Sequence, residues 1–127
     1  MKITPEQDKG WSMLMQAAQS GDQAAYSQLL SEISSLARAF LQRRLHDSSQ
    51  VEDVVQEVLL SVHTSRFTFN PKKRFSPWFY SITRRRYVDY IRKHSRRAKE
   101  ELMDREIEAY QNKPEENKGD GALSLLV

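Results

Sequence analysis

The stretch VEDVVQEVLLSV, residues 51–62, places its valines three and four positions apart. This interval repeats on one face of an α-helix, whereas a half-buried strand alternates at every second residue. Similar spacing recurs elsewhere, and strand-like alternation is not sustained anywhere in the chain. The pattern predicts an all-α fold, a compact bundle of about four helices. The valines of the buried stripe are Val51, Val54, Val55, Val58 and Val62.

The same helix carries a second, mixed face, about 100° around the axis from the valine stripe. Its residues are Asp53, Gln56, Glu57 and Leu60. Taken alone, such a face is most simply a solvated surface. Its carboxylates could also pair with arginines of a partner helix.

Two helices are expected before residue 50. The first covers about residues 6–19 and is broken by Ser20-Gly21. Asp22 is a suitable N-cap for the second, because its carboxylate can accept hydrogen bonds from the free amides of the first turn. That helix is expected to reach about residue 45. The expected core residues of the two helices are Trp11, Leu14, Met15, Ala18, Tyr26, Leu29, Leu30, Ile33, Ala37, Phe40 and Leu41.

Caps are also predicted for the later helices. Ser49 followed three residues later by Glu52 resembles a capping box that opens the valine helix. Ser76-Pro77 supplies a cap and a first-turn proline, so a fourth helix should begin near residue 77 and extend to about residue 110. Between these helices lies a positively charged loop with interleaved aromatic residues, RFTFNPKKRF, residues 66–75.

Basic side chains are concentrated in one segment. Residues 66–99 hold 12 of the 20 lysines and arginines, with Asp89 as the single acid, and both flanks are net acidic. A local block of this kind is typical of a protein that binds a polyanion, most often nucleic acid. The alternative, a solvated helix face, normally alternates its signs.

Aromatic residues in and after the loop could stack on the bases of a single strand beside cations that follow the phosphates. These residues are Phe67, Phe69, Phe75, Trp78 and Tyr80. Alternatively, Phe75, Trp78 and Phe79 anchor the fourth helix to the core. Phe79 and Ile82 are assigned to the core, and for Phe67 and Phe69 both interpretations stay open.

Several function classes are not expected. The chain has no cysteine, and His46, His63 and His94 lack metal-ligand spacing. No glycine-rich phosphate loop or nucleophile–base pair is present, so we expect no enzyme activity, no cofactor and no metal. No apolar run approaches the roughly 20 residues of a membrane span and no signal peptide is evident, so a cytoplasmic monomer without membrane contact is expected.

Two motifs at a defined separation resemble a known family. They are similar to region 2 of extracytoplasmic-function (ECF) sigma factors of the sigma-70 family. The motifs are VEDVVQEV at 51–58 and SPWFYSITR at 76–84, together with Phe67, Phe75, Asp89 and Arg92. The resemblance covers about residues 10–100. It implies a helical domain that binds RNA polymerase and promoter DNA during transcription initiation.

The resemblance also implies roles for individual residues. The mixed face of the valine helix would dock on the clamp helices of the largest catalytic subunit of core RNA polymerase. The residues concerned are Asp53, Gln56 and Glu57, with Leu60 adjacent. The loop would capture a base flipped from the non-template strand of the minus-ten element, with Phe67 and Asn70 in its pocket, and the fourth helix would contact duplex and phosphates. The expected DNA-binding residues are Arg66, Phe67, Phe69, Asn70, Lys72, Lys73, Arg74, Trp78, Tyr80, Arg84, Arg85, Arg86, Arg92, Lys93, Arg96 and Arg97.

The sequence departs from the family pattern in two places. Arg85 stands where the family often has asparagine, and arginine cannot accept hydrogen bonds. We expect residues 1–112 to form the region 2 domain and 113–127 a linker or disordered tail, with no C-terminal helix-turn-helix (region 4) domain. The sequence is expected to be a piece of a longer chain rather than a stand-alone variant.

The alternative function is a protein-interaction module, sequestered by an anti-sigma regulator or occupying polymerase without reading DNA.

Overall fold

The computed structural model describes residues 2–94, which form four α-helices and a short 3-10 turn. The helices are α1 (Pro5–Gln19), α2 (Gln23–Gln42), α3 (Ser48–Ser65) and α4 (Phe75–His94), and the turn η1 (Arg66–Thr68) directly follows α3. No strand occurs within residues 2–94. The prediction of an all-α bundle is confirmed.

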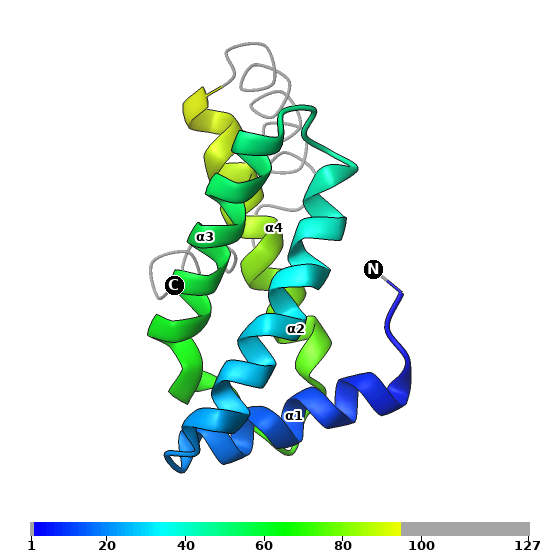
Figure 1. The fold of residues 1–127 in the computed structure, drawn as a ribbon, viewed down its shortest axis with the longest axis vertical. Coiled ribbons are helices and arrows are strands. Elements are labelled where there is room, and N and C mark those ends of the chain that lie inside the picture. Colours follow the sequence, from blue (N-terminus) through cyan, green and yellow to red (C-terminus); the bar gives the residue numbers. More distant parts are fainter. Residues whose placement is uncertain (1, 95–127) are drawn as a thin grey trace, which may run out of the picture.

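The helices α2, α3 and α4 run along the long axis of the molecule, and α1 lies across one end (Figure 1). The connection from α3 to α4 lies at that same end, where α1 contacts both η1 and α4. Residues 69–74, which link η1 to α4, have no regular secondary structure. The fold therefore brings the first helix alongside the aromatic and basic loop.

The predicted apolar stripes meet in a single core. All five valines of α3 are at most 3% exposed, and they pack with Leu29, Ile33 and Leu41 of α2. Trp11 and Met15 of α1 are buried in the same cluster. Four of the expected core residues are only partly buried and pack against it: Leu14 and Ala18 of α1, and Tyr26 and Leu30 of α2. Burial of this apolar surface is the main driving force for folding. None of the helices described is long and apolar enough to span a bilayer.

The start of α2 is as predicted. Asp22 is its N-cap, and one carboxylate oxygen accepts a hydrogen bond from the Ala25 amide at 3.0 Å. Gly21, with φ at 98°, makes the turn from α1 in a left-handed conformation that glycine adopts without steric cost. The helix ends at Gln42, three residues earlier than expected.

The capping box predicted for α3 is wrong. Asp47 is the N-cap, and its carboxylate accepts hydrogen bonds from both the amide and the hydroxyl of Ser49. These bonds favour the charged form, so they lower the pKa of Asp47. Glu52 does not return to the cap, because its carboxylate pairs with Arg38 of α2 at 2.6 and 3.0 Å. Since both side chains are well exposed, this pair adds little stability.

The start of α4 also differs from the prediction. The helix begins at Phe75, so Pro77 lies in the first turn as expected, but Ser76 is inside the helix and is not its cap. The Ser76 amide donates instead to the Asp8 carboxylate of α1, at 2.8 Å. A tertiary contact therefore provides the hydrogen-bond acceptor that a local cap would supply.

Candidate nucleic-acid interface

The loop that follows α3 presents an aromatic ring to solvent. Phe67 is 64% exposed, the most exposed of the large hydrophobic side chains described. The Arg66 guanidinium lies 4.6 Å from the centre of its ring and donates a hydrogen bond to the carbonyl of His63 at 2.6 Å. The ring is thus supported on one face by a cation and is accessible to a planar partner.

Phe69 does not have the exposed position expected of a stacking residue. It is 4% exposed, and its ring lies 5.4 Å from the rings of both Phe75 and Trp78. Of the two interpretations left open for Phe69, the structure shows the packing one, since the side chain belongs to the core cluster. The loop turns after η1 and directs the second phenylalanine inward, where burial of its apolar surface is favourable.

A small groove lies between the loop and the first turns of α4. It has a volume of about 460 Å³ and is lined by Thr68, Phe69, Asn70, Lys73, Arg74, Pro77 and Trp78. The Asn70 side chain accepts a hydrogen bond from the Lys72 amide through its oxygen, at 3.0 Å. This leaves the amide nitrogen of Asn70 as a donor at the groove. The combination of an aromatic wall, a polar edge and two cations suits a base and its phosphate.

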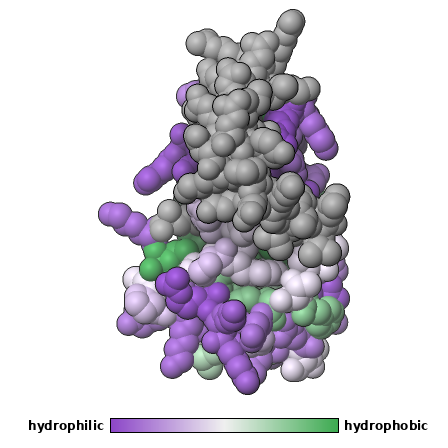
Figure 2. Space-filling model, turned by 180° about the vertical axis from the view of Figure 1, so that it is seen from behind, coloured by the Kyte–Doolittle hydropathy of each residue, from purple (hydrophilic) through white to green (hydrophobic). Residues whose placement is uncertain are grey.

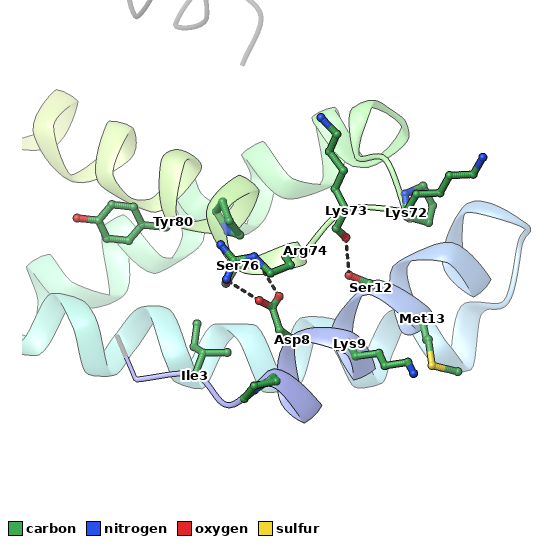
Figure 3. Close-up of a pocket in the computed structure, with 13 residues that line it drawn as sticks. Ile3, Asp8, Lys9, Ser12, Met13, Lys72, Lys73, Arg74, Ser76 and Tyr80 are labelled. Atoms are coloured by element: carbon green, nitrogen blue, oxygen red, sulfur yellow. Dashed lines mark hydrogen bonds between the residues drawn. The ribbon is translucent and has the colours of Figure 1, made fainter.

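A larger groove, of about 870 Å³, lies on the other side of the same loop, against α1 (Figure 3). Tyr80 lines this groove and packs edge-on against Phe40, with ring centres 5.7 Å apart. Lys73, Arg74 and Pro77 line both grooves. Tyr80 and Trp78, both candidate stacking residues, therefore line different grooves.

The basic residues of α4 differ in how freely they can reach a ligand. Arg84 and Lys93 are exposed, whereas Arg85, Arg86 and Arg92 are half-buried. Arg86 pairs with Asp89 at 3.1 Å. Arg85 does not line the small groove, so its difference from the family's asparagine does not alter that groove's wall. Arg96 and Arg97 lie outside the described residues.

The mixed face of α3 is exposed along its length. Asp53, Gln56 and Glu57 are all exposed, and Leu60 is 60% exposed. On the opposite side of the molecule, the coloured part of the surface in Figure 2 is mainly hydrophilic, with small hydrophobic areas in its lower half. A single exposed leucine is common on protein surfaces, so the exposure leaves this face accessible to a partner without identifying one.

Comparison with known proteins adds the decisive observation. The model of the sigma-70 region 2 family matches residues 26–97, more than half of the chain. The chain belongs to this family. Membership places it in a family of sigma factors, which regulate transcription and are not a family of enzymes.

Individual sigma factors are similar to this region 2 domain. The ECF RNA polymerase sigma factor SigF of Caulobacter vibrioides is 35% identical over 92 residues, which are 72% of this chain and 51% of that protein. The ECF RNA polymerase sigma factor RpoE of Cereibacter sphaeroides is 28% identical over 104 residues, 80% of this chain and 58% of the relative. The chain spans about half the length of these curated relatives. No significant match to a solved structure was found.

Sequence reasoning missed three polar residues of α1 that contact the loop. Asp8 and Ser12 are buried, and together with Gln19 they form hydrogen bonds to residues 66–76. The three lie at intervals of four and seven residues, on the helix face that also carries Met15. A polar side chain on an otherwise apolar face was the available signal, because such groups are buried only with a hydrogen-bond partner.

Proposed function

We propose that this sigma-70 region 2 domain joins core RNA polymerase and recognises and opens the minus-ten promoter element in transcription initiation. The observation that carries the proposal is the groove beside Trp78, where an aromatic wall, the Asn70 amide and the cations of Lys73 and Arg74 converge. The domain would work in the cytoplasm without a cofactor, and it would perform no covalent chemistry.

Promoter opening would be driven by binding. Flipping a base out of the duplex costs a few kcal/mol of stacking and pairing, and binding of the base in the groove must offset this cost. Stacking on an aromatic side chain provides about 1–3 kcal/mol per base. Because the ligand is the unpaired strand, its binding shifts the duplex towards the open state.

The decisive experiment is selection of randomised single-stranded DNA by the protein in moderate salt, followed by sequencing of the retained oligonucleotides. Enrichment of a short motif supports base reading by the groove. Retention of DNA without any motif contradicts it.

Phe67→Ala is expected to weaken binding of the selected strand about tenfold, because a stacking surface worth about 1–3 kcal/mol is lost. The substitution should leave stability nearly unchanged, since the ring is exposed. Fluorescence anisotropy with a labelled oligonucleotide measures the affinity. Leu60→Ala, which removes another exposed hydrophobic side chain, is the matched control and should bind the strand normally.

The mixed face of α3 is the proposed polymerase contact. Glu57→Lys is expected to weaken binding to a bacterial core RNA polymerase at least about tenfold, because a like charge facing partner arginines is repelled. Glu6→Lys, an exposed reversal in α1, is the control for the change in net charge. Equal affinity of both variants would place the polymerase contact elsewhere.

The exposed α3 face also favours a second candidate, a protein-interaction module. Leu60 and its acidic neighbours would suit an anti-sigma regulator as well as polymerase. In that case Glu57→Lys would abolish regulator binding, and Phe67→Ala would have no effect on any activity of the domain.

A further inference from the structure

One face of α1 is hydrogen-bonded to the loop at several points. The side-chain nitrogen of Gln19 donates to the carbonyls of Arg66 and Phe69, at 2.8 and 2.9 Å. The Ser12 hydroxyl donates to the Lys73 carbonyl at 3.1 Å. The Phe69 and Lys73 carbonyls lie outside any helix, so these bonds give them partners that the secondary structure of the loop does not supply.

The third anchor holds the end of the loop. The two carboxylate oxygens of Asp8 accept from the amide and the hydroxyl of Ser76, at 2.8 and 2.7 Å. Figure 3 shows the Asp8 side chain directed at Ser76 and the Ser12 hydroxyl at the Lys73 carbonyl. Asp8 is only 5% exposed, and its negative charge lies at the N-terminus of α4, where the helix dipole stabilises an anion.

The three side chains of α1 that bond to the loop contact it in order. Gln19 holds its beginning, Ser12 its middle and Asp8 its end, so α1 runs antiparallel to residues 66–76. Two of the residues held this way, Phe69 and Lys73, line the small groove. Side chains that do not line the small groove therefore hold the backbone of two residues that do.

We propose that Gln19, Ser12 and Asp8 are positioning residues, through which α1 holds the loop in its base-receiving conformation before the nucleic acid binds. This inference rests on the proposed function of the groove. A loop without these bonds would sample several conformations, and the apparent affinity would fall by the fraction of molecules in the receptive one. Binding of duplex through the exposed cations of α4 would not depend on the loop conformation.

The test compares Gln19→Met with Gln16→Met. The first substitution removes the donor to two loop carbonyls with little change of side-chain length, and the second changes an exposed glutamine of the same helix. Both variants are measured at a temperature where circular dichroism shows them fully folded. We expect Gln19→Met to bind the selected single strand about tenfold more weakly, with unchanged affinity for a duplex of unrelated sequence.

Ser12→Ala provides a second variant, because it removes a single bond and is less disruptive to folding. Its expected loss is about threefold for the single strand and none for the duplex. Equal single-strand affinity of Gln19→Met and Gln16→Met would overturn the inference. A parallel loss of single-strand and duplex binding would overturn it as well, since general destabilisation affects both.

Asn70→Asp separates this inference from the proposed function on which it rests, because Asn70 lines the small groove. The substitution keeps an oxygen that can accept from the Lys72 amide and removes the donor at the groove. If Asn70→Asp loses binding of the selected strand while Gln19→Met does not, the groove binds bases and the positioning role is wrong. If Asn70→Asp binds the strand normally, base reading by the groove, and with it the proposed function, fails.

Discussion

Replacing Phe75 with alanine is expected to lower the free energy of unfolding by about 3–5 kcal/mol. The Phe75 side chain is fully buried, and its ring lies within 6.1 Å, centre to centre, of four other aromatic rings. These rings come from α1, the loop and α4, and they belong to Trp11, Phe69, Trp78 and Phe79. Truncation removes the shared partner of all four and leaves a cavity that rigid helices cannot close.

Urea unfolding followed by circular dichroism measures the change. Phe67→Ala is the matched control, because it removes the same side chain from an exposed position and should change stability by no more than about 0.5 kcal/mol. A loss below about 1 kcal/mol for Phe75→Ala would show that the aromatic cluster does not hold the loop to the helices. The loop would then lack the packed support on which the groove depends.

The second large expected effect is on the salt dependence of nucleic-acid binding. Each neutralised phosphate releases counterions, and single strands give a slope of about −0.7 per contact in a plot of log affinity against log salt. With four contacts from the loop and α4, affinity should fall about fiftyfold between roughly 50 and 200 mM salt. Anisotropy titrations over this range measure the slope.

Charge removal in the loop tests the origin of this slope. Lys72→Gln should reduce the slope by about 0.7, because Lys72 is an exposed cation of the loop, lining the larger groove, and can contact one phosphate. Lys2→Gln removes an exposed lysine outside the basic segment and should leave the slope unchanged. An affinity that does not respond to salt would contradict a role of the basic segment in phosphate binding.

The fold could be predicted well from the sequence because it follows from local periodicity. The valines of α3 at intervals of three and four are all buried, and Asp22 caps α2 as its position before an apolar stripe indicates. The errors lie at helix ends. At α3, Asp47 and Ser49 are both suitable caps by residue type, but Asp47 is the cap, and the Glu52 side chain pairs with Arg38 of the neighbouring helix.

The candidate site was harder to predict because two residues of similar type and spacing have opposite positions. Phe67 and Phe69 occupy the same polar loop, yet one is 64% exposed and the other 4%. Periodicity carries no information in an irregular segment, so side-chain direction there depends on packing against other elements. Phe69 is buried because Phe75 and Trp78 of α4 lie next to it.

The sequence by itself determined the helices, the core stripes, the basic segment and the family, because each depends on residues close together along the chain. Only the tertiary structure showed that α1 lies along the loop, that Asp8 caps α4 and that Tyr80 and Trp78 line different grooves. These features depend on contacts between residues far apart in the chain. Such contacts form only when the apolar stripes of all four helices are buried together, and spacing within one helix does not specify them.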